Sequence, residues 1–212
     1  MMLIGQYDSP FVRRVGIALT TYGLAFEHQP WSTFGDADAI AKFNPLRRVP
    51  TLVLDDGTVL VESLAILEFL DEMVGPAAAT LARTGAQRRD LLRISGFAAG
   101  AAEKAVSLLY ERVLREAAFP MWVERCRAQV AETLDLLEAE RAKRTTTYLF
   151  DDQLSHADVI LATMRRFIAE PLAAEFDWAR WPALTAHAAR CEALPAFKAI
   201  LQPYRLVKPG ED

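Results

Sequence analysis

Cysteine is scarce in this chain. Only two cysteines, Cys126 and Cys191, occur among 212 residues, and they form no CxxC pair. This scarcity argues against a disulfide framework, a cysteine-ligated zinc site and a dithiol redox centre. Both thiols fall within stretches of helical periodicity, so we expect them to be small core residues of a protein kept in a reducing cytoplasm.

Long apolar runs and a strong excess of charge are also missing. No stretch approaches the roughly 20 consecutive apolar residues of a membrane-spanning helix, and the N-terminus does not resemble a signal peptide. The 24 Lys and Arg against 28 Asp and Glu leave a net charge of −4, which gives no reason to expect nucleic acid or a membrane as partner. His28 and His187 show no partner pattern, His156 is expected to be solvated, and no metal site is predicted.

The first half alternates short β-prone runs with helical ones. Strands are predicted at 3–5, 25–29, 51–54 and 59–61, where an Asp-Gly turn joins the last two into a hairpin. Helices are predicted from Phe11 to Tyr22, from Asp36, as cap, to Phe43, and from Ser63 onward. The order β-α-β followed by β-β-α favours a thioredoxin-like sheet with helices on its faces.

Strand patterns disappear in the second half. Helices are predicted at 87–118, 121–144, from Ser155, at 182–194 and at 195–201, with Ser155 and Asp158 forming a capping box. The predicted fold class is therefore α/β followed by all-α: a thioredoxin-like domain at 1–75, a linker at 76–86 and a helical bundle domain at 87–212.

The first candidate site is the predicted start of a helix at Ser9 and Pro10. A serine N-cap followed by proline leaves free N–H groups at the positive end of the helix dipole, where an anion is favoured. A thiolate is such an anion. A free thiol with a pKa near 8.5 is only a few per cent ionised at pH 7, so a hydroxyl donor there would raise its reactivity. A cap without catalytic function explains the motif equally well.

Two further motifs suggest a peptide-like ligand. Pro50 stands directly before a predicted strand, and a cis Val49–Pro50 bond would leave the backbone of Val49 free to pair with an extended peptide, although a simple turn is the alternative. Glu62 precedes Ser63, which is expected to be the N-cap of the next helix. Together they could hold the ammonium and carboxylate of an amino acid, although capping alone also explains Ser63.

Taken together, the segments SPFVRRV…LxxYGL, FNPLRRVPTLVLDDGTVLVES and AILEFLDE resemble the glutathione transferase family over essentially the whole chain. The resemblance implies glutathione as co-substrate, no metal, and Ser9 as the residue that hydrogen-bonds the glutathione sulfur. It also implies glutathione binding by a set of residues in the first half: Ser9, Phe11, Arg48, Val49, Pro50, Glu62 and Ser63.

Several assignments stay open within the resemblance. Tyr7 is the rival of Ser9, because other classes of the family use a tyrosine near the end of the first strand. Arg47 or Lys42 could replace Arg48 at the glycyl carboxylate. A second-substrate pocket between the domains would be lined by four aromatic residues: Phe11, Phe34, Tyr110 and Trp178.

The resemblance implies a cytoplasmic homodimer, paired through the first domain and the two long helices, that conjugates glutathione to small hydrophobic electrophiles in detoxification. Isomerisation, dehalogenation or peroxidase activity with the same thiol remains an alternative. So does a non-catalytic binding module of the same fold, although that module would not need residues that stabilise a thiolate. The missing CxxC argues against a dithiol oxidoreductase.

Overall fold

The computed structural model describes residues 1–205, and its contacts group the chain into two units. One unit consists of Met1–Ala82 together with the chain from Leu194, and the other is Arg83–Ala193. The predicted division at 75 and 87 stays a prediction. It differs from this grouping in the last helix, α8 (Pro195–Ala199), which contacts α1 (Pro10–Thr21) of the first unit. The end of the predicted bundle domain, 206–212, lies outside the described residues.

A four-stranded sheet of order β2-β1-β3-β4 forms the centre of the first unit. Strand β1 (Met2–Ile4) pairs in parallel with β2 (Glu27–Gln29) and antiparallel with β3 (Thr51–Val53), which continues through the hairpin into β4 (Val59–Val61). The central strands carry side chains with no exposed surface, which explains their position between neighbours. The predicted succession of strands and helices along the chain and the predicted hairpin are confirmed.

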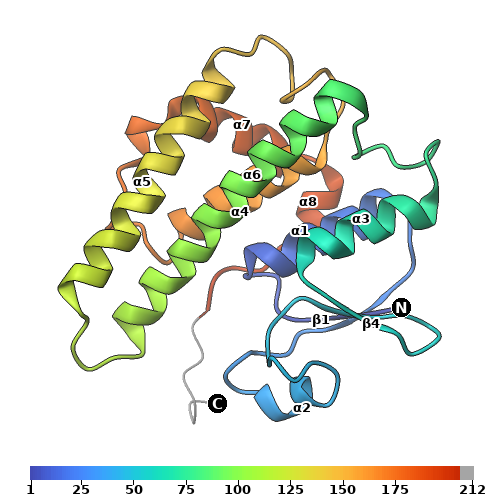
Figure 1. Cartoon of the computed structure of the whole chain (residues 1–212), viewed down its shortest axis with the longest axis horizontal. Helices are drawn as coiled ribbons and strands as arrows, with labels where there is room; N and C mark the ends of the chain where they lie inside the picture. The colour runs from blue at the N-terminus through green and yellow to red at the C-terminus, as the bar shows by residue number, and fades with distance from the viewer. Residues whose placement is uncertain (206–212) are drawn as a thin grey trace. The chain divides into compact units, whose positions relative to one another are not determined.

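Helices cover both sides of this sheet. Helices α1 and α3 (Ser63–Val74) pack against each other on one side, and the short α2 (Ala37–Ala41) lies on the other (Figure 1). The buried side of α1 contains Val12, Val15 and Leu19 at helical spacing, all with no exposed surface. The fold class of the first unit is thus the thioredoxin-like one that the sequence predicts.

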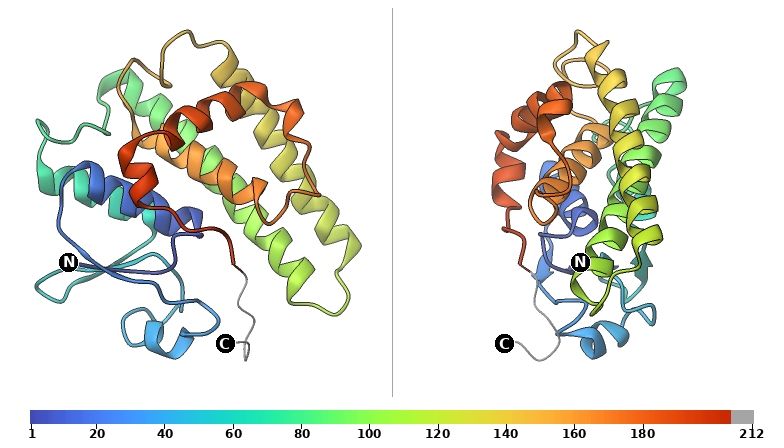
Figure 2. Two further views of the ribbon diagram at one scale, coloured as in Figure 1. Left: turned by 180° about the vertical axis from the view of Figure 1, so that it is seen from behind. Right: turned by 90° about the vertical axis from the view of Figure 1, so that its left-hand side faces the viewer.

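The second unit is helical throughout its described residues. Helices α4 (Gly85–Val113) and α5 (Pro120–Ala142) pack side by side, and α6 (His156–Ala169) contacts α4 and α7 (Pro182–Glu192) (Figure 2). A short 3₁₀ helix, η1 (Trp178–Arg180), precedes α7. The buried face of α4 is rich in small side chains, which permit close packing of the neighbouring helices: Ala98, Ala99, Ala101, Ala102 and Ala105. No helix among the described residues is long and apolar enough to cross a membrane.

The helix starts confirm part of the local predictions. Ser155 and Asp158 form the predicted capping box of α6, and both cysteines are buried and free. Asp36 precedes α2 but makes no side-chain cap; its carboxylate instead accepts a hydrogen bond of 2.8 Å from the N–H of Ser32. The prediction for His156 is wrong: it is only 4% exposed, because the first turn of α6 is buried.

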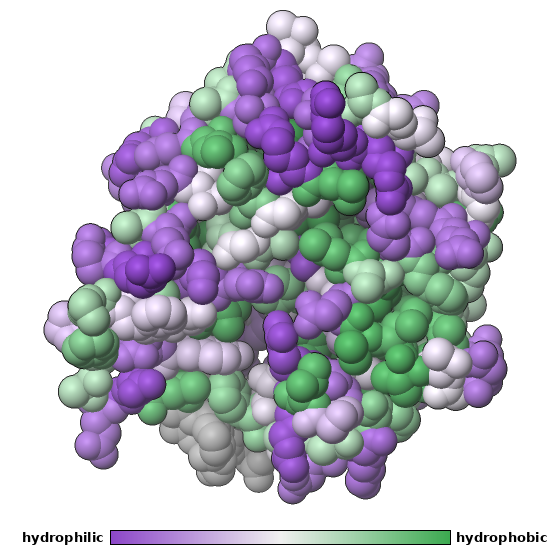
Figure 3. Space-filling model, viewed as in Figure 1, coloured by the Kyte–Doolittle hydropathy of each residue, from purple (hydrophilic) through white to green (hydrophobic). Residues whose placement is uncertain are grey.

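Apolar side chains gather on one surface of the first unit. Leu64 and Met73 of α3 are 40% and 41% exposed, and Figure 3 shows a hydrophobic area over this helix. In the second unit, Leu92 and Phe97 of α4 are 49% and 40% exposed. Exposed apolar side chains grouped on one helix are typical of interaction sites.

Candidate functional site

Ser9 caps the start of α1 as the sequence predicts. Its backbone is extended (φ −69°, ψ 125°), its Oγ accepts a hydrogen bond of 3.4 Å from the N–H of Val12, and Pro10 takes the first helical position. The N–H groups of the first turn and the helix dipole therefore favour negative charge beside the Ser9 hydroxyl. Ser9 is half-buried, so the hydroxyl is not sealed into the core.

Gly5 allows two parts of the site to approach each other. It follows β1 with φ +126°, and a Cβ atom at this position would lie 2.5 Å from Val12 Cγ2 and 2.8 Å from Val49 Cβ. No side chain fits between these neighbours. The first turn of α1 and the loop before β3 therefore meet across the bare backbone of Gly5, and the Val49–Pro50 bond in that loop is cis.

Asn44 organises the loop that leads to Val49, and the sequence analysis did not identify this function. Its side chain is 2% exposed and donates hydrogen bonds to the carbonyl of Arg48 (2.9 Å) and to Oγ1 of Thr51 (3.0 Å). Its Oδ1 accepts from the N–H of Leu46 at 3.0 Å. An asparagine before proline in a turn is the signal that indicates such a local organiser.

Glu62 and Ser63 differ from the prediction in one respect. The helix α3 begins at Ser63, and Glu62 occupies the cap position with φ +67°, so the prediction of Ser63 as N-cap is wrong. The reason is that the hydroxyl of Ser63 is engaged elsewhere: it accepts hydrogen bonds from Nε of Arg14, at 3.0 Å, and from Nη2 of Arg14. Glu62 is exposed and pairs with Arg48 at 3.2 Å.

Arg14 is the main residue that the sequence analysis missed at this site. It is 3% exposed, and its guanidinium lies 4.9 Å from the centre of the Phe11 ring. Because Ser63 Oγ accepts both N–H groups, its own proton remains available to donate to a ligand. A charged residue buried among apolar ones in a helical pattern is the signal that could have identified Arg14.

Tyr7 meets different surroundings from Ser9. Its ring stacks on His28 with centres 3.8 Å apart, and it lies beside α1, where a Cβ on Gly16 would be 3.0 Å from Tyr7 Cε1. Burial raises the pKa of Tyr7 to about 12. The phenol is therefore neutral near pH 7 and a weak acid.

The three basic candidates for a carboxylate all lie on the surface. Arg47 pairs with Asp38 at 2.6 Å, and Arg48 pairs with Glu62. Lys42 is exposed at the end of α2. Of the three, Arg48 is the one that forms an ion pair with Glu62, next to Ser63.

The four predicted pocket aromatics belong to different units, and the pocket itself stays a prediction. In the first unit Phe11 and Phe34 are half-buried. In the second unit Tyr110 is 36% exposed. Trp178 packs edge-on against Trp181 with ring centres 5.4 Å apart, and Arg165 lies 4.8 Å from the centre of its ring.

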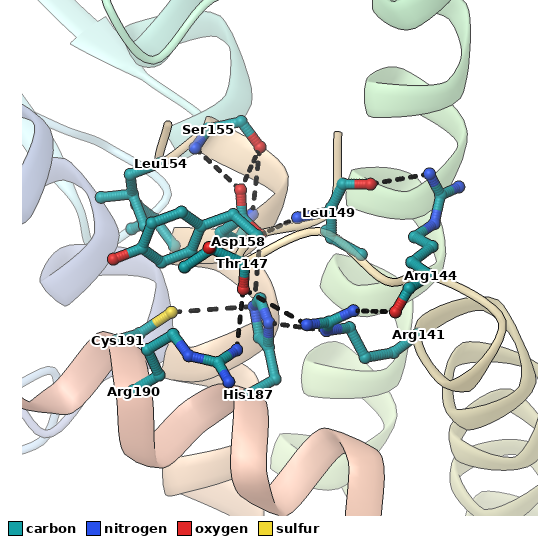
Figure 4. A network of polar contacts seen from close by, with 12 residues as sticks. Arg141, Arg144, Thr147, Leu149, Leu154, Ser155, Asp158, His187, Arg190 and Cys191 are labelled. Carbon is teal, nitrogen blue, oxygen red and sulfur yellow. Dashed lines mark hydrogen bonds and ion pairs between the residues drawn. The ribbon is translucent and has the colours of Figure 1, made fainter. Parts of the chain in front are cut away.

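A second polar cluster lies inside the helical unit (Figure 4). Nε of Arg141 lies 3.1 Å from Nδ1 of His187, so Nδ1 is the acceptor, and Nε2 carries the proton and faces Asp158 Oδ1 at 3.3 Å. Burial, followed by the charge of Arg141, lowers the pKa of His187 to about 3. The Cys191 thiol lies 3.7 Å from Nε2 of His187, and burial raises its pKa. These shifts are opposite to those of a thiolate–imidazolium pair, so the cluster is structural.

Within residues 1–205, no group of three or more His, Cys, Asp and Glu is arranged to hold a metal ion.

Comparison with known proteins adds independent observations. Residues 3–77 match the glutathione S-transferase N-terminal domain model, and residues 120–190 match the C-terminal domain model. The uncharacterized GST-like protein YibF of Escherichia coli is 32% identical over 166 residues, covering 77% of each chain. The maleylacetoacetate isomerase of Rattus norvegicus is 28% identical over 167 residues, covering 76% of this chain and 74% of its own.

Similarity to a solved structure extends over nearly the whole chain. A glutathione S-transferase from Methylobacterium radiotolerans, in complex with glutathione sulfonate, superposes with a TM-score of 0.89 at 26% identity, covering 98% of this chain and 97% of its own. The two domain models, the Escherichia coli relative and the site geometry agree. The chain belongs to the glutathione S-transferase family.

Proposed function

We propose that this protein binds glutathione and transfers its sulfur to small, mostly apolar electrophiles. The observation that carries the proposal is the Ser9 hydroxyl at the positive N-terminal end of α1, close to the loop of Val49 across Gly5. Solved relatives contain glutathione or glutathione sulfonate, which supports the same ligand here.

Each part of the tripeptide has a complementary group in the first unit. The γ-glutamyl carboxylate would accept the proton of Ser63 Oγ, oriented by Arg14, while Glu62 would take the ammonium group. The cysteinyl backbone would pair with Val49, beside Pro50. Arg48 pairs with Glu62 and so borders this site, while Arg47 and Lys42 stay candidates for the glycyl carboxylate.

The chemistry is thiolate stabilisation followed by nucleophilic attack. Lowering a thiol pKa by about two units requires roughly 2.7 kcal/mol of preferential stabilisation of the anion. A hydroxyl donor and a helix N-terminus together supply energies of this order. The thiol proton passes to solvent, the sulfur forms a bond to the electrophilic carbon, and the leaving group departs with the bonding electron pair.

Isomerisation through a glutathione adduct is the second candidate. The similarity to a protein named maleylacetoacetate isomerase favours it. Both reactions use the same thiolate and differ in whether the adduct loses glutathione again. A non-catalytic binding module of the same fold is the rival from another class.

We propose further that the chain forms a homodimer through the first unit and the two long helices α4 and α5. The exposed Leu64, Met73, Leu92 and Phe97 provide apolar surface for such contacts. Burying this surface in a partner copy would remove it from water.

The experiment uses the purified full chain. Retention on immobilised glutathione tests binding, and turnover with chlorinated aromatics, epoxides and unsaturated carbonyl compounds tests transfer, with maleylacetoacetate for isomerisation. Ser9→Ala is expected to lower kcat by about tenfold to a thousandfold, in line with the removal of one donor to an anion. Full activity of Ser9→Ala with every active substrate would contradict the catalytic assignment, and failure to bind glutathione would contradict the proposal as a whole.

A further inference from the structure

The C-terminal segment, defined here as residues 197–205, returns to the start of α1. Arg13, only 2% exposed, donates hydrogen bonds to the carbonyls of Ile200 (Nε, 2.8 Å) and Phe197 (Nη2, 3.1 Å). Its guanidinium also lies 5.6 Å from the centre of the Phe197 ring. Two views show the segment running beside the first turn of α1 (Figures 1 and 2).

The same segment then reaches the loop before Ser9. Oε1 of Gln202 accepts a hydrogen bond of 3.1 Å from the N–H of Tyr7, and the N–H of Arg205 donates to Oδ2 of Asp8 at 3.3 Å. The side-chain oxygen must be the atom that faces Tyr7, because the backbone N–H can only donate. Two successive loop residues are therefore held by a segment almost 200 positions away in the sequence.

The contact with Tyr7 lies inside the turn that presents Ser9. The N–H of Ser9 closes this turn on the carbonyl of Gln6 at 3.2 Å, and Tyr7 is the first residue between them. A part-buried N–H without an acceptor is unfavourable, so the turn would tilt toward water if Gln202 lost its oxygen. A tilt of this peptide would move the Ser9 hydroxyl relative to the first N–H groups of α1.

The Tyr7 ring and the C-terminal segment also pack closely against the same residue of α1. A Cβ atom on Gly16 would lie 3.0 Å both from Ile200 Cγ2 and from Tyr7 Cε1, so the C-terminal segment and the Tyr7 ring press against one point of α1. The turn is thus held at Tyr7 in two ways: by the packing of the Tyr7 ring and by the hydrogen bond of the Tyr7 N–H.

We propose that Gln202 is a positioning residue for the thiol-activating loop: its side-chain oxygen fixes the Tyr7 peptide and, through the Gln6–Ser9 turn, the place of the Ser9 hydroxyl. This inference rests on the proposed function of Ser9. Gln202 acts on the ionisation of the bound thiol and on kcat, whereas the groups that hold the rest of glutathione, Ser63 and Val49, lie on other elements.

The test compares Gln202→Met, which keeps length and loses the strong acceptor, with Gln202→Glu, which keeps an oxygen at the same place. Gln87→Met, on the exposed first turn of α4, is the matched control. The readouts are the ionisation midpoint of enzyme-bound glutathione, followed by thiolate absorbance against pH, and kcat and KM for glutathione.

Gln202→Met is expected to raise the midpoint of the bound thiol by on the order of one pH unit and to lower kcat about tenfold, with KM for glutathione within about twofold, because small misplacements of a catalytic group act mainly on the chemical step. Gln202→Glu is expected to recover most of kcat, and the Gln87 control to match the wild type.

An unchanged thiol midpoint in Gln202→Met, or an equal loss of kcat in Gln202→Met and Gln202→Glu, would overturn the inference. If Gln202→Met does not fold, a Gln202→Glu protein with its acceptor oxygen but a loss of about tenfold in kcat would also overturn it. Ser9→Ala separates the two levels. If Ser9→Ala loses the lowered ionisation midpoint of bound glutathione while Gln202→Met keeps it, only the assignment of Gln202 is rejected. If Ser9→Ala itself keeps the lowered midpoint, the proposed function is rejected.

Discussion

Ser9 and Tyr7 are two residues apart, yet their surroundings suit different purposes. The Ser9 hydroxyl lies at the positive N-terminal end of α1, whereas the Tyr7 ring stacks on His28, and burial raises the pKa of its phenol to about 12. We expect Tyr7→Phe to keep the thiol ionisation midpoint within about half a pH unit of wild type, because the stacked ring is retained. Thiolate absorbance of bound glutathione measures this. If Tyr7→Phe raised the thiol ionisation midpoint as much as Ser9→Ala does, Tyr7 would be the thiol activator.

His187 makes the stability of the helical unit depend on pH. In the unfolded chain a histidine titrates near 6.5, whereas burial and Arg141 lower the pKa of His187 to about 3 in the folded state. The unfolded state thus binds the extra proton first, and the free energy of unfolding falls as pH decreases from about 6.5 toward 3. Between pH 7 and pH 5 the expected loss from this group is about 2 kcal/mol.

His187→Gln provides the comparison, since glutamine can face both Arg141 and Asp158 without titrating. Urea unfolding at pH 7, 6 and 5 should give a flatter pH dependence for the variant than for the wild type. Glu140 does not interfere in this range. Hydrogen bonds from Lys143 and Arg93 lower the pKa of Glu140 to about 2, so this group affects the free energy of unfolding only below about pH 4.5. Equal slopes in both proteins would contradict the assignment.

At the scale of elements, the site depends on the close approach of α1 and the loop before β3. Gly5→Ala would place a methyl group 2.5 Å from Val12 Cγ2 and 2.8 Å from Val49 Cβ, in a backbone conformation with φ +126°. We expect a loss of about 2 to 4 kcal/mol of stability from overpacking and backbone strain, together with weaker binding of glutathione. Denaturation and calorimetric titration measure the two effects.

Gly23→Ala is the control for that change, because Gly23 also has a positive φ, +67°, but no atom lies within 4 Å of its added Cβ. It should lose stability through strain alone and keep wild-type affinity for glutathione. Equal loss of affinity in both variants would show that the close approach of α1 and the loop before β3 at Gly5 is not needed for the site.

The elements themselves could be predicted because each carries its own local pattern. The Ser9–Pro10 start, the Asp-Gly hairpin and the capping box of α6 are encoded within a few residues, and all appear as expected. The position of Ser63 could not be found in this way, because the Arg14 side chain that engages its hydroxyl comes from another helix, 49 positions earlier. The same holds for His187 and for Gln202, whose partners are distant in sequence.

At the scale of the whole molecule, the proposed dimer makes a testable demand on the exposed apolar residues of α4. Leu92→Glu with Phe97→Glu would place two charges on a surface that is to be buried in the dimer, where unpaired charge is strongly unfavourable. We expect at least a tenfold weaker dimer in sedimentation experiments, with the helical spectrum unchanged. Arg89→Glu, a charged residue on the same helix, is the control for charge alone. A double variant that dimerises as the wild type does would place the interface elsewhere.

The first unit is built from both ends of the polypeptide. Arg13 needs the carbonyls of Phe197 and Ile200, which the ribosome adds more than 180 residues after Arg13 itself. A nascent chain that has released only its first 82 residues carries the sheet but leaves the guanidinium of Arg13 without these two acceptors. Completion of the first unit is therefore a late event in biosynthesis. Translation that stopped after Ala193 would yield a complete helical unit and a first unit without these two acceptors.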